Sequence, residues 1–224
     1  MVKITFKTND ASVNKVCEQD PVIKKLITTI GDIDVVLRTD YFASLVRSII
    51  GQQISVSAAS AIYGRLQQLV NGHITAEGLL EQSTEDLRSV GLTKQKTKYV
   101  QDLAEKVKSR ELDLQHLATY NDKMIVKQLT NVKGIDKWTA EVFLLLTLGR
   151  QDVLAADDVG LQRAAQWLYK TEKSERRNIL VEKSELWKPY RSIAVYYLWE
   201  AIHLGYVVDY GTVEEVERRK DIDS

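Results

Sequence analysis

Two adjacent carboxylates, Asp157 and Asp158, stand in the stretch DVLAADDVGLQRAAQWL, where a short apolar run gives way to a helical pattern. Aspartate is a good helix N-cap, and an aspartate on a buried face is costly unless it caps, pairs or does chemistry. Asp158 heads the apolar stripe of this helix, whose next members follow at helical spacing: Leu161, Ala165 and Leu168. Asp157 falls off the stripe. The pattern leaves a cap and a chemical role open for the pair.

A second candidate is the turn VKGID, residues 132–136, between two helical patterns. Gly134 permits a tight backbone there and leaves no side chain to block an approaching ligand. The first amides of the following helix lack partners within the helix, and the helix dipole lies behind them. Such a turn suits an anion such as phosphate. An ordinary helix–helix turn is the alternative.

Two consecutive glutamines, Gln52 and Gln53, form the third candidate, in the junction GQQI between two helical stretches. Gly51 ends the first stretch, and Ser55 can cap the second. We expect both glutamines to be exposed, either for a function or simply as turn residues.

Helical periodicity runs through almost all of the chain after residue 6, and only KITF, residues 3–6, is predicted as a short strand. The helix ends are well marked, with Asp20, Ser55 and Ser83 as N-caps. The helix from Lys137 to Leu148 is apolar almost all round and should lie at the centre of the fold. About ten helices with short connections predict an all-α protein.

Composition limits the function classes. Lysine plus arginine equals aspartate plus glutamate at 31 each in 224 residues, so net charge does not favour a nucleic-acid partner. Any such affinity must come from local patches, for which the candidates are Lys94, Lys96, Lys98, Lys133 and Lys137.

The single cysteine, Cys17, excludes an internal disulfide and a cysteine-ligated iron–sulfur cluster. The apolar runs are too short to cross a bilayer, and no leader pattern opens the sequence. We therefore expect a cytoplasmic protein, nucleoid-associated if bacterial.

Four segments between residues 42 and 199 resemble one known family in the same order. LTNVKGIDKWTAEVFLL resembles the helix-hairpin-helix of the DNA glycosylase superfamily named for that motif. LVRSIIGQQISVSAA, LRSVGLTKQKTKYVQDLA and WKPYRSIAVYYLW resemble the glutamine-rich loop, the second turn region and the C-terminal helix of its 3-methyladenine branch. The resemblance is to the DNA-3-methyladenine glycosylase II type, in a short form without the N-terminal sheet domain of some relatives.

This resemblance implies a catalytic role for Asp158 and leaves Asp157 as the helix cap. Cleavage of an N-glycosidic bond builds positive charge on the deoxyribose, which a preplaced anion stabilises while it orients water. One aspartate is sufficient when the leaving base is cationic. The implied function is a monofunctional glycosylase of base excision repair that removes 3-methyladenine and 7-methylguanine from double-stranded DNA.

The resemblance also implies a base pocket and a wedge. Trp138 and Trp199 fall on positions that line the pocket, where aromatic faces favour a cationic base; Tyr41 and Phe42 are weaker candidates, and all four are alternatively core. The flipped base leaves a gap in the duplex, which Gln53, in preference to Gln52, would fill. Relatives that also cut the strand carry a lysine at position 138. Its absence implies hydrolysis by water.

The residues expected to contact DNA are Gln52, Gln53, Ser55, Lys94, Lys133, Gly134, Ile135, Lys137 and Thr139. Asp136 replaces a second glycine of the family turn. We interpret it as a structural replacement that tolerates a left-handed backbone and caps the next helix. Main-chain carbonyls of Thr130, Val132 and Ile135 would hold a monovalent cation, and no other cofactor is expected.

The resemblance further implies two helical lobes with an active-site cleft between them, residues 41–130 forming one lobe and residues 1–40 with 131–224 the other. We expect a monomer whose partner is double-stranded DNA with alkylated bases, and no membrane association. The alternatives are a glycosylase for another damaged base, a catalytically silent DNA-binding protein and an all-α scaffold without a DNA role.

Overall fold

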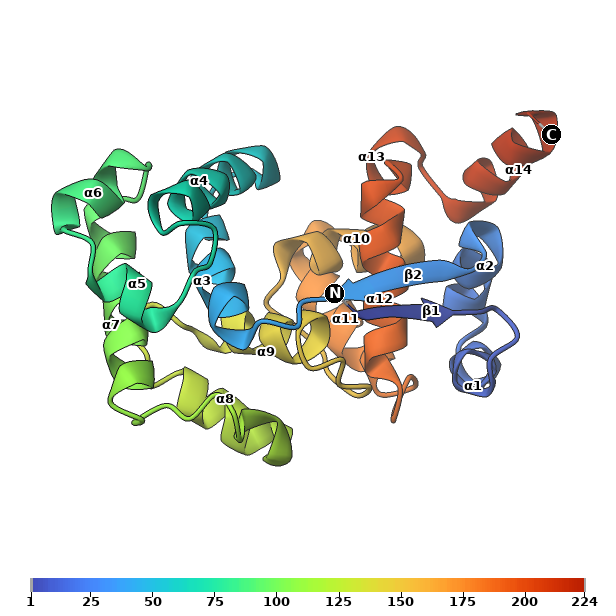
Figure 1. Cartoon of the computed structure of the whole chain (residues 1–224). Coiled ribbons are helices and arrows are strands. Elements are labelled where there is room, and N and C mark those ends of the chain that lie inside the picture. Colours follow the sequence, from blue (N-terminus) through green and yellow to red (C-terminus); the bar gives the residue numbers. More distant parts are fainter. Residues whose placement is uncertain (1, 224) are drawn as a thin grey trace. The chain divides into compact units, whose positions relative to one another are not determined.

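The computed structural model describes residues 2–223 and divides into two compact units (Figure 1). One unit combines both ends of the chain, Met1–Leu37 with Gly149–Ser224, and the other is Arg38–Leu148. The second unit extends past the expected boundary at residue 130, because the helix that follows the 132–136 turn packs against helices of this unit. The turn therefore belongs to the middle segment of the chain.

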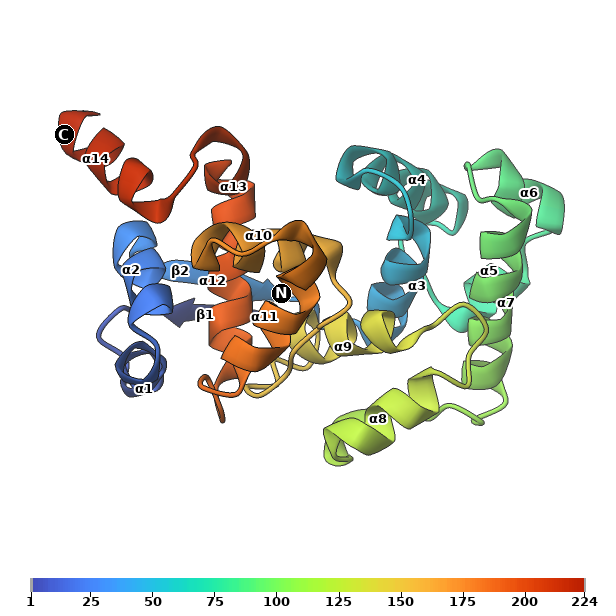
Figure 2. The same ribbon diagram turned by 180° about the vertical axis from the view of Figure 1, so that it is seen from behind.

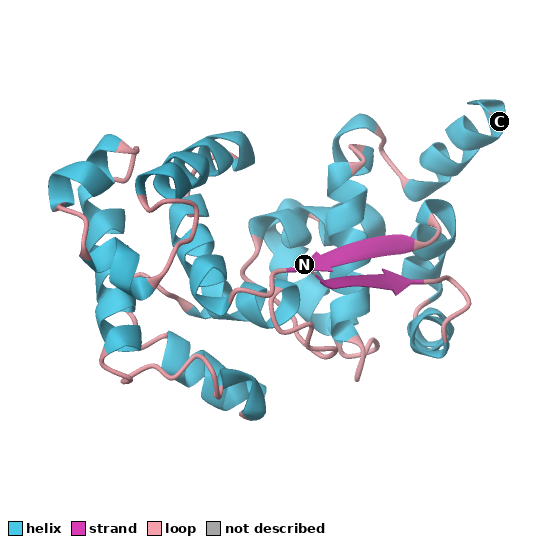
Figure 3. Cartoon of the chain, in the orientation of Figure 1, coloured by secondary structure: helices cyan, strands magenta, loops and turns pink. Residues whose placement is uncertain are grey.

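The unit of the two chain ends begins with strand β1 (Val2–Phe6), helix α1 (Ala11–Gln19), helix α2 (Pro21–Ile30) and strand β2 (Ile33–Leu37). The two strands pair antiparallel, Val2 with Leu37 and Phe6 with Ile33 (Figure 3). Strand β2 was not predicted from the sequence. Its five residues are too few to show a clear hydrophobic period, and its partner strand β1 is distant in the sequence. The predominantly helical class is confirmed.

The same unit continues with α10 (Val159–Tyr169), η2 (Lys173–Glu175), α11 (Arg176–Ser184), α12 (Arg191–His203), α13 (Tyr206–Asp209) and α14 (Val213–Asp223). Helix α12 is the central element, since α1, α2, β2, α10 and α13 all contact it (Figure 2). Its residues from Ser192 to Leu198 are buried on every side. Tyr197 donates its hydroxyl hydrogen to the Gly31 carbonyl oxygen at 3.0 Å, which ties α12 to the end of α2.

Asp20 is a buried group that links several elements of this unit. It is 2% exposed and caps α2, as predicted, by accepting from the amides of Val22 and Ile23. Its other oxygen accepts from the Tyr169 hydroxyl at 2.5 Å and from the Trp187 indole N–H at 2.9 Å. A buried carboxylate with four donors is fully satisfied, so Asp20 joins α2 to α10 and the α11–α12 connection.

The middle unit contains α3 (Tyr41–Gly51), α4 (Val56–Leu69), α5 (Ala76–Leu80), α6 (Thr84–Ser89), α7 (Lys94–Lys108), η1 (Leu117–Thr119), α8 (Asp122–Leu129) and α9 (Lys137–Leu146). The predicted N-caps are confirmed: Ser55 accepts from the Ala58 amide, and Ser83 forms a capping box with Asp86. Helix α9 is buried on most of its surface, also as predicted. No described helix is long and apolar enough to span a membrane.

Candidate active site and DNA interface

The turn between α8 and α9 depends on a glycine. Gly134 has φ +82°, and a Cβ atom built on it would lie 2.0 Å from the ring of Tyr99, which comes from α7. A side chain at this position would therefore meet both backbone strain and a direct clash. The glycine was expected to leave room for a ligand. The structure adds a different reason for it, the close approach of an aromatic ring.

Asp136 caps α9, as predicted: its Oδ1 accepts from the Thr139 amide at 2.8 Å. Its backbone is extended, with φ −87° and ψ 176°, so the expectation of a left-handed conformation was wrong. Gly134 alone makes the left-handed step of this turn, and Asp136 needs no unusual geometry. The family's second glycine is thus replaced without strain.

The backbone amides of the turn are the groups that could bind an anion. Within residues 2–223, the amides of Gly134, Asp136 and Lys137 have no acceptor. The Lys133 amide, in contrast, donates to Asp102, a buried carboxylate of α7, at 2.9 Å. Asp102 also pairs with the Lys133 ammonium at 3.1 Å. The turn is thereby anchored on α7 while three of its amides remain available.

Lys133 of the turn and Lys137 at the start of α9 have exposed side chains that pair with carboxylates. The Lys133 side chain is 74% exposed, and that of Lys137 is 64% exposed and pairs with Glu141 at 3.1 Å. The carboxylate partners are buried, with side-chain exposures of 11% for Asp102 and 10% for Glu141, so these pairs differ from fully exposed ones that contribute little.

Two further residues of the expected DNA interface are buried. Thr139 is fully buried and Ile135 is 4% exposed, and their contact with DNA stays a prediction. The Ile135 amide donates to the Val132 carbonyl at 3.1 Å and closes the turn. The carbonyls of Thr130, Val132 and Ile135 as cation ligands stay a prediction. Among the described residues, no group of three His, Cys, Asp or Glu side chains could hold a metal ion.

The two glutamines after α3 have different environments. The Gln52 side-chain amide donates to the Gly134 carbonyl at 2.7 Å and to the Thr139 hydroxyl at 3.2 Å, so it links the loop to the turn. Gln53 has a left-handed φ of +59° and is exposed. The role of Gln53 as the wedge stays a prediction. Beside it, Ile54 and Val56 are exposed apolar residues that sequence reasoning missed.

Lys96 supports the glutamine loop instead of facing solvent. Its ammonium donates to the carbonyls of Ile50 and Gln52, both at 2.7 Å, at the C-terminal end of α3. Burial lowers the pKa of the Lys96 ammonium. A cation at a helix C-terminus is stabilising, and here it holds the start of the loop that carries Gln53. Its sequence-based place in a phosphate patch is corrected.

A cavity of about 610 Å³ joins the three parts of this surface. The glutamine loop, the N-terminal end of α7 and the turn all line it, through residues that include Gln53, Lys94, Tyr99, Gly134 and Asp136. The structure thus brings together Gln52, Gln53, Lys94, Gly134 and Ile135 of the predicted set. Ser55 lies outside the cavity, and its hydroxyl caps α4.

The aromatic candidates of this unit are only partly accessible. Phe42 is 8% exposed and belongs to the core, which is the alternative stated for it. Tyr41 is half-buried and packs edge-on against Phe143 at 5.7 Å between ring centroids. Trp138 is half-buried in the first turn of α9. The pocket roles of Tyr41 and Trp138 stay predictions.

Asp158 of the other unit is the N-cap of α10, where its Oδ1 accepts from the Leu161 amide at 2.8 Å. The assignment of the cap to Asp157 was wrong. Asp157 is exposed and pairs with Arg177 at 2.9 Å. Asp158 is half-buried, and Leu161, Ala165 and Leu168 of its stripe are buried as predicted. Because a carboxylate offers about four acceptor sites, capping does not exclude a chemical role.

Two residues that sequence reasoning missed shape the surroundings of Asp158. A Cβ atom at Gly160 would lie 3.0 Å from Asp158 Oδ1 and 3.3 Å from Ile202, so the glycine keeps space beside the carboxylate. Buried Gln162 donates to the Ala156 carbonyl at 2.8 Å and fixes the loop before Asp158. Gly-x-Gln after an aspartate cap is too common a pattern to reveal either role.

Trp199, the second pocket candidate, lies on α12 of the same unit. It is half-buried, and its ring stands 6.3 Å from that of Tyr196. Tyr196 in turn packs against half-buried Phe6 of β1, which extends the aromatic cluster to the strand pair. The pocket role of Trp199 stays a prediction.

Residues 46–189 match the family model described as HhH-GPD superfamily base excision DNA repair protein. The crystal structure of a DNA-3-methyladenine glycosidase from Bacillus halodurans superposes with a TM-score of 0.86 at 38% identity, over 96% of this chain and 99% of that one. A Schizosaccharomyces pombe 3-methyladenine DNA glycosylase in complex with abasic DNA superposes with a TM-score of 0.77 at 25% identity, over 86% and 96%.

Among curated proteins, DNA-3-methyladenine glycosylase 1 of Schizosaccharomyces pombe is 28% identical over 73% of either chain. The family model covers more than half of the sequence, and the match includes the glutamine loop, the turn and Asp158. The chain belongs to the HhH-GPD superfamily of base excision DNA repair proteins.

Proposed function

We propose that this member of the superfamily is a monofunctional DNA N-glycosylase that removes alkylated purines, such as 3-methyladenine and 7-methylguanine, from double-stranded DNA. The observation that carries the proposal is the half-buried carboxylate of Asp158, fixed at the N-terminus of α10. The relatives named for 3-methyladenine support the substrate class.

Asp158 acts electrostatically in the proposed mechanism. Departure of the base leaves positive charge on the deoxyribose, and an anion that is already in place stabilises this charge without reorganisation. The carboxylate also orients the attacking water. The bonds to Leu161 and within the preceding loop hold it, since the Asp158 amide donates to the Ala155 carbonyl at 3.0 Å.

Water is the nucleophile because no lysine takes the position of a Schiff-base former. Trp138 occupies that position, and neighbouring Lys137 pairs with Glu141. The product is an abasic site in an intact strand, and the reaction needs no cofactor.

The middle unit binds the DNA in this proposal. The three amides of the turn grip a phosphate, and Gln53 enters the gap left by the flipped base. Gln52 bonds to Gly134 of the turn and Lys96 bonds to the Gln52 carbonyl, and these bonds fix the position of the loop that carries Gln53.

The test is to incubate the protein with methylated duplex DNA and to chromatograph the free bases released. Asp158→Asn should reduce release at least about 100-fold, because the neutral amide cannot stabilise the cationic sugar. Asp157→Asn is the matched control and should keep wild-type activity. Undiminished release by Asp158→Asn would contradict the catalytic assignment.

The same assay distinguishes the alternatives. Strand nicking without added alkali would show a lyase and overturn the monofunctional assignment. Duplex binding without release of any methylated base would favour another lesion or a silent DNA-binding protein, which a panel of deaminated and oxidised bases would separate.

A further inference from the structure

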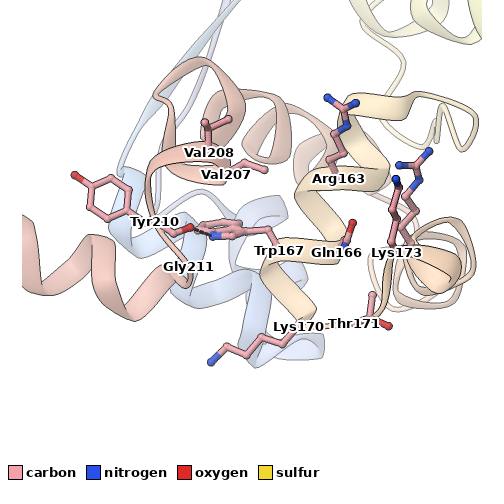
Figure 4. Close-up of a pocket in the computed structure, with 11 residues that line it drawn as sticks. Arg163, Gln166, Trp167, Lys170, Thr171, Lys173, Val207, Val208, Tyr210 and Gly211 are labelled. Carbon is pink, nitrogen blue, oxygen red and sulfur yellow. Dashed lines mark hydrogen bonds between the residues drawn. The ribbon is translucent and has the colours of Figure 1, made fainter.

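A second large cavity, of about 600 Å³, lies in the unit of the two chain ends (Figure 4). One face of α10, the 170–176 segment and residues 207–211 line it. Its α10 residues Arg163, Gln166 and Trp167 stand on the side of α10 away from the buried stripe that Asp158 heads, and Lys170, the C-cap of α10, follows them. The proposed function uses none of these residues.

The cavity is positively charged although the chain as a whole is neutral. Arg163, Lys170, Lys173 and Arg176 line it, and no carboxylate does. Lys170 pairs with Glu214 at 3.4 Å, and Arg176 donates to the neutral Gln162 oxygen at 3.1 Å. Arg163 and Lys173 have no acceptor anywhere in residues 2–223. Uncompensated like charges at one place favour an anionic ligand.

The cations and the apolar residues occupy different parts of the cavity. Arg163, Gln166 and Lys173 lie together at one end, while Val207 and Val208 form a wall at the other. Val208 is 83% exposed. The Trp167 indole lies between the two parts, and its N–H donates to the Tyr210 carbonyl oxygen at 2.8 Å.

We propose that this cavity binds a phosphate monoester of nucleotide size. The Arg163 guanidinium, the Lys173 ammonium and the Gln166 amide at one end suit a compact, doubly charged group better than separated carboxylates, because guanidinium binds phosphate oxygens in pairs. The apolar wall takes the sugar and base, and the volume falls within the usual range for ligands of this size. The bound phosphate belongs either to a free nucleotide or to the 5′-phosphorylated end of a DNA strand.

Calorimetry on the full chain tests the proposal, with 2′-deoxyadenosine 5′-monophosphate as the probe and deoxyadenosine as its uncharged counterpart. The monophosphate should bind at least about 10-fold more tightly than the nucleoside, because the contacts to the phosphate are charge-assisted. A double variant with Arg163→Gln and Lys173→Gln should bind the monophosphate at least about 10-fold more weakly than the wild type does. Lys15→Gln with Lys123→Gln, two exposed lysines on other helices, is the matched control and should bind as the wild type does.

A thymidine hexamer with and without a 5′-phosphate distinguishes the two sources. Tighter binding of the phosphorylated hexamer than of the monophosphate identifies a DNA end, and the reverse identifies a free nucleotide. The proposal is overturned if neither phosphate binds, if binding survives in the Arg163 and Lys173 double variant, or if hexaglutamate binds as tightly. Base release on methylated duplex and the unfolding temperature verify that the double variant is folded.

Discussion

Asp136 and Asp158 make the same local structure in two different places. Each is an N-cap whose Oδ1 accepts from the amide three residues on, at 2.8 Å. Asp136 is exposed in a turn whose neighbouring amides lack acceptors, whereas Asp158 is half-buried and its own amide is bonded within the loop. At one helix start the backbone is available to a ligand, and at the other the carboxylate is held in place.

This difference shows that an aspartate cap has no fixed function. What surrounds the cap decides whether the helix presents donors to an anion or a negative charge to a cation. The two glycines near these caps also differ in role. Gly134 makes room for the Tyr99 ring, and Gly160 leaves room beside the Asp158 carboxylate.

Two single variants, Asp158→Asn and Asp136→Asn, should differ most in their rate of base release. Asparagine caps helices as well as aspartate does, so neither variant should lose its helix cap. Asp158→Asn should lose at least about 100-fold in base release, and Asp136→Asn should stay within about 3-fold. Equal losses in the two variants would show that the caps do not differ in function. Single-turnover release from methylated duplex is the measurement.

Gly134→Ala should strongly destabilise the protein. The alanine would adopt a left-handed backbone and its Cβ would clash with the Tyr99 ring, which together cost about 3 kcal/mol of unfolding free energy. Urea unfolding measures this. Gly64→Ala on α4 is the control, because its Cβ meets nothing within 4 Å and should leave stability equal or higher. A small effect of Gly134→Ala would mean that Tyr99 does not hold the turn.

Gly160→Ala should affect activity and not stability. Alanine favours the helix by about 1 kcal/mol over glycine, but its Cβ would crowd Asp158 and shift the carboxylate. We expect base release about 10-fold slower with an unchanged or higher unfolding temperature. Unchanged activity would show that the space beside the carboxylate is not needed.

Gln53→Ala should slow base release about 5-fold, because the flipped state would lose the side chain that replaces the base in the stack. The measurement is release from a duplex compared with release from the same strand alone, where no stack has to be restored and the variant should equal the wild type. Gln68→Ala, an exposed glutamine of α4, controls for loss of a surface amide. A similar loss on the single strand would point to the base pocket instead.

Asp136→Gly should leave duplex affinity equal or raise it up to about 3-fold at low salt, since it removes a negative charge beside the amides that would bind phosphate. Glycine also caps with a loss of only about 0.3 kcal/mol. Fluorescence anisotropy with a labelled duplex measures the affinity. A sharp loss would contradict the structural role assigned to Asp136.

Short-range features of the fold and site could be predicted from the sequence. The caps at Asp20, Ser55, Ser83 and Asp136 depend on bonds to amides two or three residues away, so residue type and position were sufficient. The same local pattern identified the turn at Gly134. It could not separate Asp157 from Asp158 as the cap, because either residue of an adjacent pair satisfies the rule.

The sequence by itself determined the helices, their ends and the short set of polar residues that could do chemistry. Only the tertiary structure decided what each of these residues touches. Gln52 reaches Gly134 across 82 positions, and Asp102 reaches the Lys133 amide across 31. Such bonds depend on how helices pack, and packing is set by the whole core rather than by any local pattern. This is why adjacent Gln52 and Gln53 have different environments, one bonded to the turn and the other exposed.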